Sequence, residues 1–228
     1  MKTFVSLALL ALAISTSDAT PITYTPSPAD LNNLDHHFAY TWRIDNINLA
    51  GATISGASLT FINIRNWDAN PNILFIHLFD TAKYSGVRSF MDATGAPVPA
   101  NQMADDFASP LLASNPLIAS GTKNTFLTSV SFTMTPTTFT YNFTAAQLLA
   151  LQSYIANGHN IAFGLDPDCH FFNDGIRFKI VTKVPDTGST AILLGLAMVV
   201  LAWAQRKAAM AELQFRTTGR TAEKKAQI

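Results

Sequence analysis

Between residues 20 and 183 the chain contains no glutamate. The acidity of this segment comes entirely from eleven aspartates, a residue that favours turns and loops over helix interiors. Glutamate is among the good helix formers, so its absence over such a length is atypical of a helical domain. The composition therefore favours a domain built from strands and turns.

Seven stretches of this segment have the β-branched and aromatic residues and the short lengths typical of strands. They cover residues 39–47, 57–64, 73–79, 126–134, 137–143, 161–165 and 175–181. The third stretch is apolar on nearly both faces, which predicts a central strand. Turn-forming residues between the second and third stretches predict an antiparallel hairpin, and Pro136 predicts another hairpin between the fourth and fifth.

One helix is predicted, with Thr144 as N-cap, apolar residues at helical spacing over 145–155, and Asn157-Gly158 in C-cap positions. Residues 91–120 form a long irregular segment, which makes them a candidate binding rim. Strands at short spacing, joined by turns and interrupted by one helix, predict a mainly β fold. The expected architecture is an antiparallel β-sandwich of the jelly-roll type.

The first nineteen residues have the order of a secretory signal peptide. Lys2 supplies a positive charge, residues 4–14 are apolar, and Ser17-Asp18-Ala19 forms a small-x-small cleavage site. We expect export and a mature chain that begins near Thr20. Residues 20–183 then have a length suited to one extracytoplasmic domain with its own core.

A turn, an apolar run and a basic stop follow this domain. The turn is Val184-Pro185-Asp186-Thr187-Gly188, the apolar run covers 191–204, and Arg206-Lys207 ends it. The run is short for a full span, but its flanks favour a single transmembrane helix over a buried core helix. Because the basic residues lie on its C-terminal side, residues 208–228 are predicted to form a cytoplasmic tail.

This arrangement resembles the VPDSG variant of the PEP-CTERM sorting signals, which exosortases recognise in Gram-negative bacteria. Thr187 stands where the pattern has serine and keeps the hydroxyl, and residues 208–228 follow the stop where such proteins end within a few residues. The resemblance implies that segment 184–207 anchors the chain in the inner membrane. It also implies cleavage by an exosortase-like enzyme and delivery to the cell surface or extracellular matrix.

The densest polar cluster runs from Asp166 to Gly175, between the last two predicted strands. Hard cations prefer several oxygen ligands on a flexible loop. The candidate calcium ligands are Asp166, Asp168, Asn173 and Asp174. The order Asp-x-Asp, His, aromatic residues and Asn-Asp-Gly resembles the final-strand loop of PEP-CTERM β-sandwiches, and the spacing is not that of an EF-hand. In the alternative interpretation, Asp-Pro and Asn-Asp-Gly only form turns.

Histidine and cysteine give weaker indications. Adjacent histidines in a strand point to opposite faces, so Asp35-His36-His37 predicts a surface or capping role and not a metal site. His77 is expected to be half-buried within its strand. Cys169 is the only cysteine, which excludes an internal disulfide, and we expect it to be a small buried residue.

Function is predicted from the remaining features. Trp67, in the turn-rich connection, is the candidate residue for stacking on a sugar ring. The eleven aspartates of segment 20–183 outnumber its eight lysines and arginines, which argues against nucleic acid as a partner. Recognisable catalytic motifs are absent from the sequence. We therefore expect a non-enzymatic binding or structural domain with extracellular polysaccharide as its candidate ligand; the alternative is a secreted polysaccharide hydrolase that uses two aspartates.

Overall fold

The computed structural model describes residues 21–91, 104–183 and 194–211. The chain divides into two units, residues 1–184 and residues 185–228, and each is described by itself. The predicted signal peptide and the predicted sorting motif at 184–188 lie outside the described residues.

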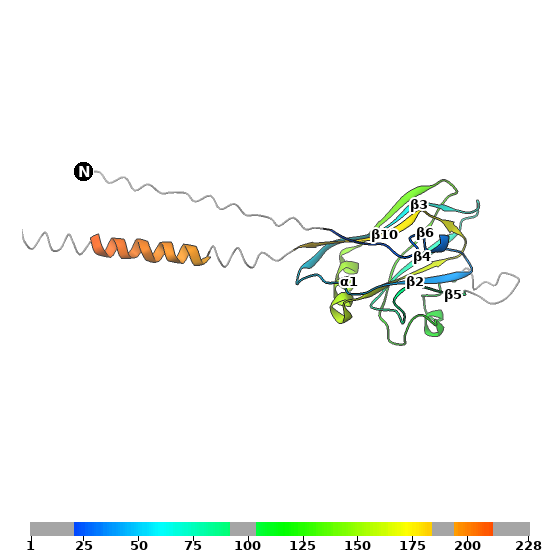
Figure 1. Cartoon of the computed structure of the whole chain (residues 1–228), viewed down its shortest axis with the longest axis horizontal. Coiled ribbons are helices and arrows are strands. Elements are labelled where there is room, and N and C mark those ends of the chain that lie inside the picture. The colour runs from blue at the N-terminus through cyan, green and yellow to red at the C-terminus, as the bar shows by residue number, and fades with distance from the viewer. Residues whose placement is uncertain (1–20, 92–103, 184–193, 212–228) are drawn as a thin grey trace, which may run out of the picture. The chain divides into compact units, whose positions relative to one another are not determined.

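Two antiparallel sheets make up the first unit (Figure 1). The first sheet has the order β1 (Ile22–Tyr24), β10 (Gly175–Lys183), β3 (Thr53–Asn66) and β7 (Thr137–Asn142), and β9 (Phe171–Phe172) also pairs with β3. The second sheet has the order β5 (Gly86–Met91), β2 (Phe38–Ile44), β8 (Ile161–Pro167), β4 (Ile73–Phe79) and β6 (Asn124–Ser131). The unit also contains the 3-10 helices η1 (Leu31–Asn33) and η3 (Leu111–Ser114) and the α-helix α1 (Ala145–Gly158).

The chain crosses from one sheet to the other at most of its connections. β1, β3, β7 and β10 lie in the first sheet, whereas β2, β4, β6 and β8 lie in the second. This is the strand order of a jelly roll, in which two Greek keys form a sandwich. β5 is an additional edge strand beside β2. The prediction of a mainly β, antiparallel fold is confirmed.

Both predicted hairpins are wrong. β3 pairs with β10, β7 and β9, while β4 pairs with β6 and β8, so the turn between them carries the chain across the sandwich. β6 and β7 also lie in different sheets. The turn-forming residues suit a crossing between sheets as well as a tight reversal, so they do not identify the pairing partner. The prediction of 73–79 as a central strand is confirmed, because β4 is paired on both edges.

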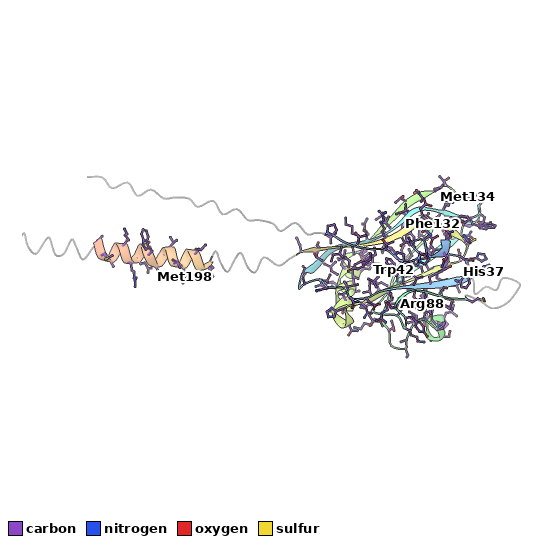
Figure 2. The ribbon with its side chains drawn as sticks, in the orientation of Figure 1. His37, Trp42, Arg88, Phe132, Met134 and Met198 are labelled. Atoms are coloured by element: carbon purple, nitrogen blue, oxygen red, sulfur yellow. The ribbon has the colours of Figure 1, made fainter. Side chains whose placement is uncertain are left out.

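Aromatic side chains from the two sheets meet in the core. Phe163 of β8 packs edge-to-face against Phe178 of β10, with ring centroids 4.8 Å apart. The ring of Trp42, labelled in Figure 2, lies 5.5 Å from the ring of Phe163 between centroids. All three are buried, and burial of a side chain of this size contributes roughly 1.5–3 kcal/mol. These contacts hold the sheets face to face.

The helix α1 begins where it was predicted. The side chain of Thr144 accepts a hydrogen bond from the backbone of Gln147, and the side chain of Gln147 accepts one from the backbone of Thr144. This capping box satisfies two N–H groups of the first turn. The helix continues to Gly158 instead of ending before it, because His159 takes the left-handed conformation at the C-cap (φ 56°).

The described part of the second unit is a helix over residues 194–211 (Figure 1). Every side chain of this helix is exposed, including the large apolar ones such as Met198, labelled in Figure 2. Lys207 Nζ lies 5.0 Å from the centre of the Trp203 ring. Among the helices of the described residues, none combines the length and the apolar character needed to cross a membrane.

Candidate functional site

The predicted calcium loop begins in β8 and returns through β9 to β10. Asp166, near the end of β8, is 1% exposed, and its Oδ2 accepts a hydrogen bond of 2.7 Å from the backbone N–H of Asp106. Asp168 Oδ1 accepts a hydrogen bond from the backbone N–H of Ile73, at the start of β4. Both carboxylates therefore tie the loop to neighbouring parts of the chain.

The other two predicted ligands lie on the opposite side of β9 in the sequence. Asn173 is buried; its Nδ2 donates to the carbonyl of Asp30 at 2.9 Å, and its Oδ1 accepts from the N–H of Gly175 at 3.0 Å. Asp174 is exposed and accepts a hydrogen bond of 2.7 Å from Asn63 Nδ2. The four groups thus bond to four different segments, and a calcium ion held by all of them would compete with these bonds. Calcium binding here stays a prediction.

Burial raises the pKa of the Asp168 carboxyl from 3.8 to about 6. The hydrogen bond from Ile73 N–H opposes this rise in the pKa, while the charge of Asp68 adds a smaller increase. Asp168 is therefore partly protonated close to neutral pH. A carboxyl with such a pKa is suited to proton transfer if a substrate can reach it.

The structure brings together a group of potential metal ligands that sequence reasoning missed. Asp35, His36 and His170 each place one ligand atom within 4.8 Å of the others, and across residues 21–91, 104–183 and 194–211 this is the one such group of three. Asp35 and His36 lie in the turn between η1 and β2, whereas His170 directly precedes β9. Asp35 and His36 are far from His170 in the sequence, so no local motif contains all three. The fold brings the two segments together.

Two backbone hydrogen bonds hold these segments in place. Phe171 N–H donates to the carbonyl of Leu34 at 3.3 Å, which joins the His170 segment to the turn that carries Asp35. Trp67 N–H donates to the carbonyl of His170 at 3.0 Å. The group therefore lies beside three strand ends: the end of β3, the start of β2 and the start of β9.

The turn itself is stabilised by Asp35. Its Oδ1 accepts hydrogen bonds from the backbone N–H of His37 at 3.0 Å and from His37 Nδ1 at 2.9 Å. The predicted capping role is thus confirmed for Asp35. The His36 ring lies against the His37 ring, with centroids 3.9 Å apart, and one of its nitrogens belongs to the group with Asp35 and His170. Burial lowers the pKa of the His36 ring. The rings of His37 and His170 lower this pKa further, whereas the charge of Asp35 raises it. The His36 ring is accordingly neutral near pH 7.

Cys169 is partly exposed, so the prediction of a buried cysteine is wrong. It lies in the short link between β8 and β9. Burial still raises the pKa of its thiol, and the charges of Asp68 and Asp168 raise the pKa further. A thiol with a raised pKa is a weak nucleophile at neutral pH.

Trp67, the predicted sugar-stacking residue, is 59% exposed at the start of the turn between β3 and β4. The same turn is held by side chains. Asp68 accepts hydrogen bonds from the backbone N–H of Asn70 at 3.0 Å and from Asn72 Nδ2 at 2.8 Å. Asn66 Nδ2 donates to the carbonyl of Asn70 at 2.7 Å. This network stabilises the backbone of the turn at whose start Trp67 lies.

A groove of about 500 Å³ lies beside this turn, between residues 68–71 and residues 131–135. Phe132 and Met134 supply apolar surface, and Met134 is 55% exposed at the edge of the domain (Figure 2). Asp68 and the neighbouring asparagine and threonine residues supply hydrogen-bonding groups. The combination of apolar surface with a few polar groups is typical of a site for a small polar ligand.

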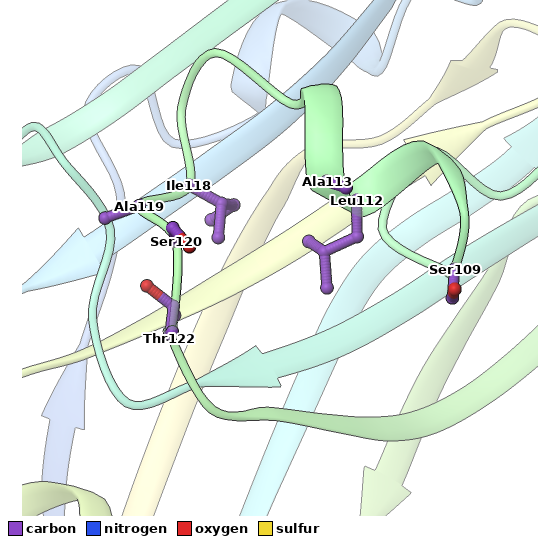
Figure 3. A pocket seen from close by; sticks show the side chains of 8 residues that line it. Ser109, Leu112, Ala113, Ile118, Ala119, Ser120 and Thr122 are labelled. Atoms are coloured by element: carbon purple, nitrogen blue, oxygen red, sulfur yellow. The ribbon is translucent and has the colours of Figure 1, made fainter.

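The predicted binding rim at 91–120 lies partly outside the described residues. Its described part borders a smaller pocket of about 270 Å³. Figure 3 shows the apolar side chains of Leu112 and Ile118 with the hydroxyls of Ser109, Ser120 and Thr122 around this opening. Charged side chains do not line it, so this pocket offers less specificity than the groove beside Trp67.

The C-terminal segment supplies the relationship to known proteins. The VPDSG-CTERM motif matches residues 183–208, which include the turn at 184–188, the apolar run and the basic stop. Comparison with curated proteins and with solved structures finds no match. The chain therefore carries, at residues 183–208, the sorting motif of the VPDSG-CTERM proteins, and the resemblance found in its sequence is confirmed.

Proposed function

We propose that this protein is exported, held in the inner membrane by segment 184–207, and then cut by an exosortase-type enzyme for delivery to the cell surface or extracellular matrix. There the β-sandwich acts by binding or as a structural component. The single observation that carries the proposal is the VPDSG-CTERM motif at residues 183–208, directly after the last strand of the sandwich. Cleavage near Pro185 would release the whole folded domain.

The apolar surface of the helix over 194–211 supports the anchoring step. Leu194, Val199 and Leu201 are each about 60% exposed or more, and a row of such side chains is unfavourable in water. The apolar segment from Gly188 to Ala204 has seventeen residues, which is the lower end of the length that spans a bilayer. The basic pair that follows it suits the cytoplasmic side.

The exposed indole of Trp67 and the groove beside the turn that follows it support binding of an extracellular polysaccharide. An exposed indole presents a flat apolar face, on which the C–H groups of a sugar ring can stack. Asp68 and the amides of the same turn would then accept and donate hydrogen bonds at the ring edge. Since the side-chain network holds the backbone of the turn in position, little backbone entropy would be lost on binding.

Absence of turnover is part of the same proposal. Asp166 is buried and its carboxylate is engaged by the backbone of Asp106, so it is poorly placed to act on a solvent-borne chain. A hydrolase remains the second candidate because of Asp168, whose pKa is raised to about 6 by burial and which is influenced by the charge of Asp68. A carboxyl with a raised pKa near a second, charged carboxylate is the pairing that glycoside hydrolysis uses.

Sorting is tested in a Gram-negative host with and without an exosortase. We expect the full chain to be released from the membrane fraction only in the host that has the enzyme. Replacing Pro185 and Asp186 with alanine should keep the chain in the membrane fraction, while Ser189→Ala, just outside the turn, should leave release unchanged. Release of the double variant at the normal rate would contradict the proposed processing.

Binding is tested by retention of the purified protein on insoluble polysaccharide. Trp67→Ala should weaken retention by about two- to tenfold, which corresponds to the 0.5–1.5 kcal/mol of an aromatic contact. Tyr84→Ala is the matched control, because Tyr84 is 51% exposed in a different turn. Release of reducing ends that is lost in Asp168→Asn would instead establish the hydrolase, and equal retention of both variants would exclude Trp67 from the binding site.

A further inference from the structure

We propose that Asp35, His36 and His170 form a binding site for a divalent transition-metal ion of the zinc type. The inference is independent of sorting and of polysaccharide binding. It starts from the placement of three ligand atoms, one from each residue, within 4.8 Å of one another. In tetrahedral coordination with bonds of about 2.0 Å, ligand atoms lie about 3.3 Å apart. Binding would therefore draw these atoms closer together by at most about 1.5 Å.

Each of the two histidines has a ring nitrogen that is available to bind a metal ion. His36 Nδ1 and His170 Nε2 are both inaccessible to water and neither has a hydrogen-bond partner. His36 Nδ1 lies 3.5 Å from Asp35 Oδ1, a contact without hydrogen-bond geometry. A buried polar nitrogen without a partner costs free energy. A metal ion between the rings would give each of them one.

The ligand set selects the class of ion. Two imidazole nitrogens and one carboxylate oxygen suit zinc and its neighbours in the first transition series, whereas calcium and magnesium prefer oxygen ligands alone. Three protein ligands leave a fourth position for water or for a group of a bound molecule. Cys169 is adjacent in sequence to His170 but does not belong to the group, so the site has no thiolate.

Outer interactions hold the carboxylate in position. His37 donates from its backbone N–H and lies with Nδ1 2.9 Å from Asp35 Oδ1. The backbone N–H of Asp35 donates to the hydroxyl of Tyr40 at 2.9 Å, and Tyr40 is buried in β2. Such support orients a ligand before the ion arrives, and its loss typically lowers metal affinity 10- to 100-fold. His37 is therefore a positioning residue for this site.

The test uses the full chain without a histidine tag, purified in detergent and stripped with a chelator. Titration with Co²⁺, whose visible absorption reports tetrahedral coordination, should give a saturable band at one equivalent, and Zn²⁺ should displace it. His36→Gln and His170→Gln should each weaken binding by more than 100-fold, and His37→Ala by about 10- to 100-fold. Cys169→Ser and His159→Asn should bind as the wild type does.

The proposal would be overturned if the wild type gave no Co²⁺ band, or if the band persisted in both glutamine variants. Loss of the band in Cys169→Ser would place the ion on the thiol instead and would also overturn it. Circular dichroism of each stripped variant shows whether the domain is folded before metal is added. If His170→Gln is unfolded, His36→Gln decides the question, since His36 is part-buried in a turn that does not belong to a strand.

Discussion

The carboxylate of Asp168 accepts a hydrogen bond from the backbone N–H of Ile73, so the loop after β8 is fastened to the first residue of β4. The backbone returns the contact, because Asp168 N–H donates to the carbonyl of Ile73 at 3.0 Å. The pair continues the β4–β8 pairing for one step beyond the sheet. Asp168 is thus half-buried in a structural position, and its raised pKa is a consequence of that position.

Stability of the domain should depend on pH through this carboxyl. The pKa of Asp168 in the folded chain, about 6, lies above the ordinary value of 3.8. Between these two values the folded state binds more protons than the unfolded state, so stability is highest below about pH 4 and is lost as the pH rises through 6. Because water screens a half-buried group, we expect a loss of about 1–2 kcal/mol.

Asp168→Asn should remove this loss, since an amide oxygen still accepts from Ile73 N–H and carries no charge. Urea unfolding of the variant between pH 4 and pH 7 measures the slope. Asp174→Asn makes the same chemical change at an exposed carboxylate of the same loop and should keep the wild-type slope. An unchanged slope in Asp168→Asn would mean that another group titrates.

How far the sequence predicts this fold depends on whether a signal is local. The N-cap at Thr144 and the strand at 73–79 depend on neighbouring residues, and both are confirmed. The strand predicted over 39–47 ends at Ile44, because Asn46 takes a positive φ of 57° that the pattern does not reveal. Strand pairing depends on long-range packing, and for that reason both hairpins were predicted wrongly.

The same distinction applies to the candidate sites. The polar loop after β8 was visible in sequence as a cluster, yet its side chains bond outward to segments far along the chain. The group of Asp35, His36 and His170 was not visible, because the rule that adjacent histidines face apart holds for strands and His36 lies in a turn. The turn before β2 orients His36, and the fold brings the segment before β9, which carries His170, next to that turn.

Both ring nitrogens of the buried histidine of β4 should take part in hydrogen bonds. His77, predicted to be half-buried, is only 2% exposed. Asn124 donates from Nδ2 to the carbonyl of Phe107 at 2.7 Å, so its Oδ1 faces His77 Nδ1 at 2.8 Å and requires a proton there. His77 Nε2 lies 2.8 Å from Asp105 Oδ2, and a further proton has to lie between them. Nitrogen NMR of the labelled ring checks both protons.

Removing His77 should be costly, because Asp105 Oδ2 would lose its histidine partner where the Asp105 side chain is only 13% exposed. We expect His77→Ala to lower the free energy of unfolding by about 3–5 kcal/mol. His37→Ala is the matched control in the presence of a chelator: it breaks a His–Asp pair of 2.9 Å at an exposed site, where we expect at most about 1 kcal/mol. Equal losses in the two variants would show that burial of the pair contributes nothing.

The contact between the two sheets should dominate the stability of the sandwich. Phe178 is fully buried and its ring packs against Phe163, with 4.8 Å between the centroids. Phe178→Ala should cost about 3–5 kcal/mol, since the cavity left between two sheets cannot collapse fully. Phe126→Ala removes the same side chain from a position that is 51% exposed, and we expect about 1 kcal/mol there. Thermal and urea unfolding of the two variants provide the comparison.

Membrane retention before processing should depend on the apolar run over residues 191–204. Replacing Leu193, Leu194 and Leu196 with aspartate should release the chain in soluble form in a host without an exosortase, because each charge costs about 2.5–3.5 kcal/mol near the centre of a span. Ala208, Ala209 and Ala211, beyond the basic pair, are the control positions for the same three charges and should leave the chain in the membrane fraction. A triple leucine variant that still fractionates with membranes would show that another part of the chain provides the anchor.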